Sequence, residues 1–238
     1  MPHHHSSKQY DLELDAIRTQ VLQMAALVEG QCALAIESFW TGNTDKARHV
    51  IKGDQEVNRL EVVLDDACNH IIVRRQPAAN DLRMVMATLK AITDLERIGD
   101  EATKIARNAL DLAERKFVTA NVHADLQVLT TEVAAMLHES LDAFACMDAG
   151  RAAELIIRDE RIDSEFRTVM LRLITSMSED PRSISARLDV LWIAKALERI
   201  GDHAKNIAEY VVFVVLGHDI RHTIGHAGAV PAPAVASA

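Results

Sequence analysis

The chain has 238 residues, 49% of them hydrophobic and 26% charged, and this balance excludes disorder for most of its length. Asp and Glu number 35 against 26 Lys and Arg, and the resulting net charge of −9 argues against a nucleic-acid-binding surface. The longest apolar run, Tyr210 to Leu216, is far shorter than the roughly 20 residues of a membrane-spanning helix. The first residues lack the apolar stretch of a secretory signal, so we expect a cytoplasmic protein.

Taken in chain order, the sequence divides into six helical segments of about 30 residues each. From Leu14 to Phe39, and again from Val122 to Met147, apolar residues recur every three or four positions, which is the period of a helix. No segment shows the alternation typical of strands, so we expect an all-α protein whose last helix ends near Leu216. The breaks contain Gly, Pro or polar residues and fall at 41–43, 76–80, near 118–119, at 148–150 and at 179–181.

The second half of the sequence repeats the first. The segment Leu-Glu-Arg-Ile-Gly-Asp at 95–100 recurs at 197–202, and both copies continue as x-Ala-x-x-Ile-Ala. Three amphipathic helices joined by short connections pack as antiparallel neighbours, so the repeat predicts two three-helix bundles. We expect the first bundle over 8–118, the second over 119–217 and a disordered tail over 218–238.

Carboxylates interrupt the apolar faces of the predicted helices. On a helical wheel with about 100° per residue, Glu198 and Asp202 fall among the apolar positions of the sixth helix, and Asp159 and Asp163 interrupt the face of the fifth. A buried carboxylate without a partner costs several kcal/mol, so a counter-charge is required. The side chains that we single out as candidate metal ligands are Asp54, Asn58, Glu96, Asp100, Asp159, Asp163, Glu198, Asp202 and Glu209.

Two readings of these carboxylates stay open. Oxygen ligands without any His at Glu-x-x-His spacing suit hard or borderline cations, and several acids per repeat suit a multinuclear cluster. Alternatively, Lys205 and Arg107, which lie on the acidic faces, neutralise them as salt bridges. Arg97 and Arg199 point about 100° away from the adjacent glutamates, so we do not expect them as partners.

Three further residues stand close to the repeated acids. Gly99 and Gly201 each cost about 1 kcal/mol in a helix interior, which indicates close helix approach or ligand access. His203, beside Asp202, reads as an exposed helix residue rather than as a group that supports a ligand.

The doubled motif, in a chain of this length, resembles the PhoU family of phosphate-signalling proteins over residues 8 to 217. The resemblance implies two pseudo-twofold-related three-helix bundles whose acidic motifs, here Glu96/Asp100 and Glu198/Asp202, bind a multinuclear cluster of iron or zinc, with magnesium or manganese as alternatives. Asn58 stands where the second repeat has an aspartate, and Arg107 where it has a glutamate, which predicts weaker or different metal binding in the first repeat.

The resemblance also implies a function. Such proteins are non-enzymatic, often dimeric regulators that couple the ATPase of a phosphate ABC transporter to a sensor histidine kinase and repress the phosphate-starvation response. We therefore expect contact with the membrane only through these partners. Two alternatives remain, namely a metal-free helical scaffold and a metalloenzyme that uses the carboxylate cluster.

Overall fold

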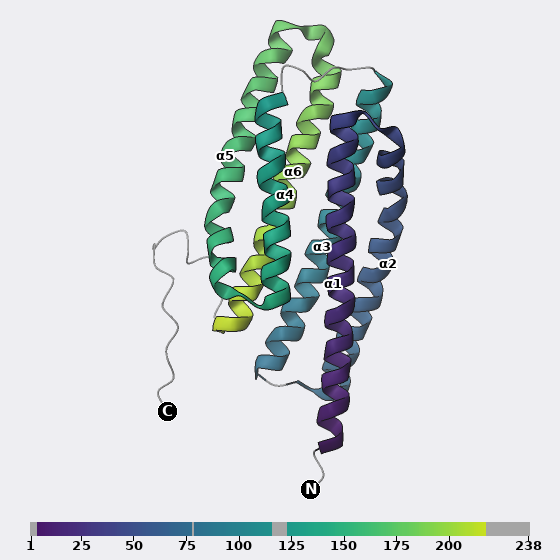
Figure 1. Cartoon of the computed structure of the whole chain (residues 1–238), viewed down its shortest axis with the longest axis vertical. Helices are drawn as coiled ribbons and strands as arrows, with labels where there is room; N and C mark the ends of the chain where they lie inside the picture. The colour runs from purple at the N-terminus through teal and green to yellow at the C-terminus, as the bar shows by residue number, and fades with distance from the viewer. Residues whose placement is uncertain (1–3, 78, 116–122, 218–238) are drawn as a thin grey trace.

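The computed structural model describes residues 4–77, 79–115 and 123–217, and within these ranges every regular element is a helix (Figure 1). The elements are α1 (His4–Thr41), α2 (Thr44–Arg75), α3 (Ala79–Glu114), α4 (His123–Cys146), α5 (Ala149–Glu179), the short 3-10 helix η1 (Pro181–Ser183) and α6 (Ile184–Leu216). The all-α prediction is confirmed. None of the described helices is both long and apolar enough to cross a bilayer.

Local capping explains where several helices begin and end. The Asn43 side chain accepts hydrogen bonds from the backbone N–H groups of Asp45 and Lys46, which fixes the start of α2. Asp148 does the same for α5 through the N–H of Arg151. The expected breaks at 41–43, 76–80, 148–150 and 179–181 are therefore correct to within about two residues. The break expected near 118–119 and the tail expected over 218–238 lie outside the described residues.

The helices form two antiparallel three-helix groups, α1 to α3 and α4 to α6 (Figure 1). The apolar stripe predicted for the first helix is buried along its whole length, from Ile17 to Phe39. α3 and α6 lie side by side at the centre and make the most extensive contact between any two helices. The buried side chains of both groups belong to one continuous hydrophobic core, so the two bundles share their interior.

The two repeated glycines allow the outer helices to approach the central ones. A Cβ atom on Gly99 of α3 would stand 3.2 Å from Val57 of α2. A Cβ atom on Gly201 of α6 would stand 3.2 Å from two atoms of Ile162 in α5. Val57 and Ile162 occupy matching positions of the repeat, so both bundles use the same close contact. Close packing therefore accounts for both glycines.

Candidate metal centres

In the second bundle, four carboxylates of α5 and α6 interact with one another where these two helices are in contact. We call Asp159, Asp163, Glu198 and Asp202 the second cluster. Asp159 is only 5% exposed, and the Glu198 side chain is 12% exposed. Burial raises the pKa of Asp202, and the negative charges of Glu198, Asp159 and Asp163 raise it further, against the opposing effect of Lys205. The carboxylates of the second cluster therefore lie close enough together to repel one another.

The first bundle repeats this arrangement between α2 and α3, where Asp54, Glu61, Glu96 and Asp100 form the first cluster. The Glu96 side chain is 16% exposed. Burial raises its pKa, and the charges of Asp100, Glu61 and Asp54 act in the same direction, whereas Arg97 lowers it. Each bundle thus places four carboxylates near one another along one pair of helices.

The two clusters differ in the partner of their first aspartate. In the second cluster the Nζ atom of Lys205 donates to Asp159 Oδ2 at 2.6 Å. At the matching position of the first bundle, the Oγ1 atom of Thr103 donates to Asp54 Oδ1 at 3.2 Å. A neutral hydroxyl therefore stands in the first cluster where an ammonium group stands in the second. Glu209 is buried. Burial lowers the pKa of Lys205, but the hydrogen bond to Asp159 and the charges of Asp159, Glu209 and Asp202 outweigh it and raise that pKa.

Several expected positions differ from those observed. Asn58 is exposed, although it follows Asp54 by the same four residues that separate Asp163 from Asp159. Asp163 is partly exposed and lies 3.7 Å from Arg167. The expectation that Arg97 avoids the adjacent glutamate is wrong, since its Nε atom lies 3.4 Å from Glu96 Oε2. Glu61 was not among the expected ligands, because the matching residue of the second repeat is Phe166 and the repeat gives no indication of it.

The side chains of both clusters are of the chemical type that binds cations. Both clusters offer carboxylate oxygens, the ligands of hard and borderline cations. Burial first, and then the repulsion between neighbouring carboxylates, raises the pKa of Glu96 and of Asp202, and a cation would relieve both effects. In the described residues no group of three carboxylate, imidazole or thiol side chains is placed to hold one ion. A cation would therefore have to draw the carboxylates of a cluster together by rotation of their side chains.

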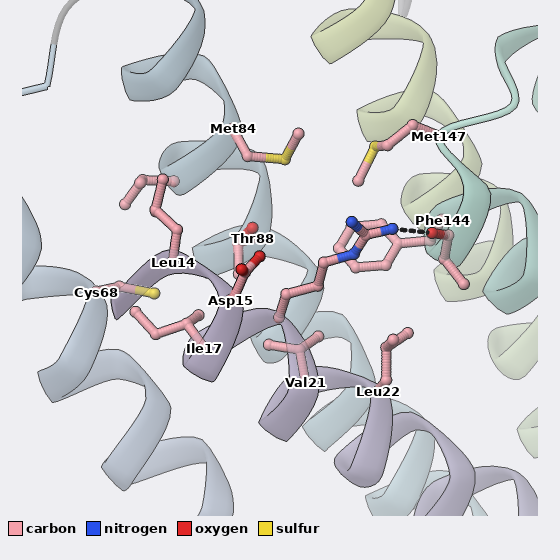
Figure 2. A pocket seen from close by; sticks show the side chains of 13 residues that line it. Leu14, Asp15, Ile17, Val21, Leu22, Cys68, Met84, Thr88, Phe144 and Met147 are labelled. Atoms are coloured by element: carbon pink, nitrogen blue, oxygen red, sulfur yellow. Dashed lines mark hydrogen bonds between the residues drawn. The ribbon is translucent and has the colours of Figure 1, made fainter. Parts of the chain in front are cut away.

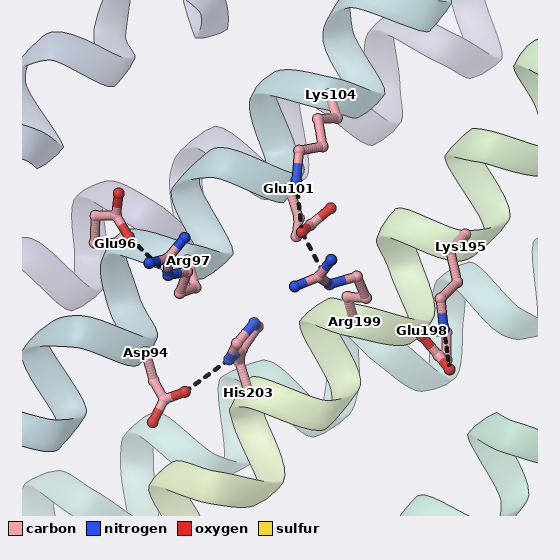
Figure 3. A network of polar contacts seen from close by, with 9 residues as sticks. All are labelled: Asp94, Glu96, Arg97, Glu101, Lys104, Lys195, Glu198, Arg199 and His203. Atoms are coloured by element: carbon pink, nitrogen blue, oxygen red, sulfur yellow. Dashed lines mark hydrogen bonds and ion pairs between the residues drawn. The ribbon is translucent and has the colours of Figure 1, made fainter.

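A polar network lies between the clusters, across the contact of α3 and α6 (Figure 3). His203 Nδ1 lies 2.7 Å from Asp94 Oδ1, and Asn206 donates to the same oxygen at 3.1 Å. Both members of the His203 and Asp94 pair are largely buried, so the expectation of an exposed histidine is wrong. This network joins the two bundles through polar contacts as well as through the shared core.

An apolar cavity of about 190 Å³ lies at another part of the junction between the bundles (Figure 2). Leu14, Ile17 and Val21 of α1 face Met84 of α3 and Phe144 of α4 across it. At its edge an Arg18 nitrogen donates to the backbone oxygen of Ala145 at 2.5 Å. The cavity holds no cluster carboxylate and is separate from both candidate metal centres.

Comparison with known proteins agrees with this architecture. The family described as "PhoU domain" matches residues 21–109 and 126–211, one match in each bundle. The phosphate-specific transport system accessory protein PhoU of Escherichia coli strain K12 is 43% identical over 221 residues, which cover 93% of this chain and 91% of that protein. The PhoU homologue of Pseudomonas aeruginosa is 42% identical over 219 residues, or 92% of this chain and 90% of that protein.

Solved structures show the same fold. The crystal structure of PhoU from Pseudomonas aeruginosa superposes with a TM-score of 0.85 at 40% identity and covers 88% of this chain and 100% of that one. The phosphate transport system regulatory protein PhoU from Streptococcus pneumoniae gives a TM-score of 0.79 at 27% identity, over 88% of this chain and 98% of that one. With a family match in each bundle and relatives aligned over nearly their whole length, the chain belongs to the PhoU family.

Proposed function

We propose that this protein is a metal-binding cytoplasmic regulator of phosphate uptake and of phosphate-starvation signalling. In this role it couples the ATPase of a phosphate ABC transporter to a sensor histidine kinase and represses the starvation response when phosphate is plentiful. The observation that supports the metal-binding part is the recurrence of four interacting carboxylates on matching helix pairs of both bundles. The names of the relatives, which describe an accessory protein of phosphate transport, support the regulatory part and a non-enzymatic role.

Iron, zinc, magnesium or manganese would be held by carboxylates of the two clusters. Glu96, Asp100 and Asp54 are the proposed ligands in the first bundle, and the second cluster supplies those of the other. A bound cation would neutralise charge that burial otherwise penalises. In each bundle two neighbouring helices carry the carboxylates, α2 with α3 and α5 with α6. The close contacts at Gly99 and Gly201 allow these helices to lie near each other.

Deletion of the gene tests the regulatory part. We expect phosphate-regulon expression to become constitutive in medium rich in phosphate and to return to repression when the intact gene is restored. A complementing copy with Arg59→Gln, an exposed residue of α2 outside both clusters, should repress as the wild type does. Unchanged repression in the deletion strain would overturn the proposal.

A metal-free helical scaffold is the second candidate, and the ion pair between Lys205 and Asp159 favours it for the second bundle, because an internal ammonium group already supplies positive charge there. Elemental analysis of untagged protein, purified without chelator, separates the two candidates. Metal in the wild type that is lost in Glu198→Gln/Asp202→Asn and in Glu96→Gln/Asp100→Asn supports the metal-binding regulator. Metal at background level in the wild type supports the scaffold.

A homodimer and partner contacts with the transporter ATPase and the kinase complete the proposal. Analytical ultracentrifugation of the full chain tests the dimer, with a monomer at all concentrations as the contrary result.

The metalloenzyme is the remaining alternative. Turnover of a phosphoester that depends on Glu198 and Asp202 would replace the proposed regulator with this enzyme.

A further inference from the structure

A second kind of site lies on the contact between α3 and α6, beside the second cluster. It is an open pocket of about 380 Å³, within the range of small-molecule sites. α3 contributes one wall and α6 the other, so the pocket spans the junction of the two bundles. Its lining residues are Glu101, Lys104, Asn108, Trp192, Lys195, Ala196 and Arg199.

The lining is positively charged, although the chain as a whole has a net charge of −9. Lys104, Lys195 and Arg199 supply three cations, and Glu101 supplies the only carboxylate among the lining residues. That carboxylate is 2% exposed and is bound from two sides, by Lys104 Nζ at 2.8 Å and by Arg199 Nε at 3.1 Å (Figure 3). Glu101 therefore lies beneath the cations and holds them in place.

The third cation is fixed in a similar way. Lys195 Nζ donates to both carboxylate oxygens of Glu198 at 2.6 Å and lies 5.3 Å from the ring centroid of Phe166. An ammonium group has three N–H donors and a guanidinium has five, so these contacts leave donors of all three cations available to an anion. Cations positioned by carboxylates behind them, with donors to spare, are suited to the oxygens of a phosphoryl group.

An aromatic side chain completes the pocket. Trp192 belongs to α6 and is 60% exposed, which is unusual for so large an apolar group. An indole face beside a cationic groove is a stacking platform for a nucleobase. Neither the shared core nor the cluster carboxylates account for the exposed position of this residue.

We propose that this pocket binds a phosphorylated small molecule, with its phosphoryl group held by Lys104, Lys195 and Arg199. The phosphoryl group belongs either to a nucleotide, whose base stacks on Trp192, or to free inorganic phosphate, which leaves the indole uncovered. None of the seven lining residues is one of the four carboxylates of either cluster, but Lys195 is bonded to Glu198 of the second cluster, so binding is tested on the metal-free protein.

Fluorescence titration tests the proposal, because the chain has two tryptophans and Trp40→Phe leaves Trp192 as the only one. This protein is titrated with ADP, inorganic phosphate and adenosine in buffer that contains chelator. Binding of a nucleotide predicts a saturable change in emission with ADP, competition by phosphate and no comparable effect of adenosine. If the pocket contacts only the phosphoryl group and no base stacks on Trp192, calorimetry on the wild type gives equal affinity for phosphate and ADP.

Two matched variants distinguish specific binding in the pocket from a general attraction of anions to surface cations. Lys104→Gln removes a half-exposed cation whose carboxylate partner keeps Arg199, and it should weaken binding about tenfold or more. Arg59→Gln removes a cation of similar exposure with an i−3 glutamate partner on α2, outside the pocket, and should leave affinity unchanged.

Absence of saturable binding of ADP and of phosphate at millimolar concentration, by both fluorescence and calorimetry on the wild type, would overturn the proposal. Equal weakening by Lys104→Gln and Arg59→Gln would overturn it too, since the anions would then follow general charge. Because every titration contains chelator, a failure here is distinguishable from a failure of the metal-binding proposal, which the elemental analysis decides.

Discussion

Lys205 donates a hydrogen bond from its ammonium group to the buried carboxylate of Asp159 at 2.6 Å, and thereby places a positive charge inside the second cluster. The first cluster has Thr103 at the matching position, so its carboxylates have no such ammonium partner there. On the basis of Asn58 and Arg107, the sequence predicts weaker or different metal binding in the first repeat. The internal lysine favours the opposite order, because a cation that enters the second cluster must compete with Lys205.

Replacement of Lys205 by the residue of the other repeat tests this order. We expect Lys205→Thr to lower the free energy of unfolding by about 1–3 kcal/mol in chelator, because Asp159 loses a charged partner. The same variant should gain more stability than the wild type on addition of Mn²⁺. Urea unfolding with and without Mn²⁺ measures both effects. Arg167→Gln, which removes an exposed cation 3.7 Å from Asp163, serves as the control and should change stability by about 0.5 kcal/mol at most. A smaller Mn²⁺ effect in Lys205→Thr than in the wild type would contradict the prediction.

The raised pKa of Asp202 predicts a pH dependence of stability in the metal-free protein. The folded chain keeps the proton of this carboxyl group at pH values where the unfolded chain, with an ordinary pKa near 3.8, has lost it. The free energy of unfolding therefore falls as the pH rises from the unfolded-state pKa through the raised pKa of the folded state, and the loss persists above the raised pKa. Asp202→Asn removes this loss, so its advantage over the wild type should be absent at low pH and grow toward neutrality. Denaturant unfolding across this pH range measures it, with the exposed Asp66→Asn as control. A constant difference in the free energy of unfolding between Asp202→Asn and the wild type at all pH values would refute the raised pKa of Asp202.

The close contact at Gly201 predicts a strong effect of side-chain size. Gly201→Leu should destabilise the protein by about 1–3 kcal/mol, since its Cβ atom alone would stand 3.2 Å from Ile162. Ile162→Ala in the same chain should recover part of this loss, which a double-mutant cycle measures by thermal unfolding. Gly30→Ala is the matched control: its Cβ atom meets nothing within 4 Å, so the change should stabilise α1 by about 0.5–1 kcal/mol. Additive effects of Gly201→Leu and Ile162→Ala would show that the two side chains do not collide.

The contact of His203 with Asp94 predicts that the histidine stabilises the junction of the bundles. His203→Leu should cost about 1–3 kcal/mol, because the buried carboxylate of Asp94 keeps only its hydrogen bond from Asn206. Urea unfolding measures the loss. His70→Leu removes an exposed histidine with an aspartate partner one turn away, and it should have little effect. Equal stability of His203→Leu and the wild type would mean that the interbundle pair contributes nothing.

The sequence predicts the fold well because the spacing of apolar residues within each segment indicates a helix. The apolar stripe from Ile17 to Phe39 has the helical period, and it is buried as that period requires. The doubled motif likewise predicts that Glu96 and Glu198 occupy matching places. These features depend on spacing within one helix or on comparison of two copies, and both can be read directly from the chain.

The contacts that the sequence does not predict depend on how the helices pack against one another and on the conformations of long side chains. His203 and Asp94 are 109 positions apart, and only the packing of α6 on α3 brings them together. Arg97 reaches Glu96 because a flexible side chain is not confined to the direction of its Cα–Cβ bond. Glu61 joins the first cluster without a counterpart in the second repeat, so no comparison of the copies could identify it.

The central placement of α3 and α6 decides whether the protein can be divided. Since these two helices bury much of each other's surface, a fragment that ends between the bundles would expose an apolar seam to water. Such halves should aggregate when expressed alone and should reassemble when expressed together. Each three-helix bundle therefore depends on the other to cover its apolar surface.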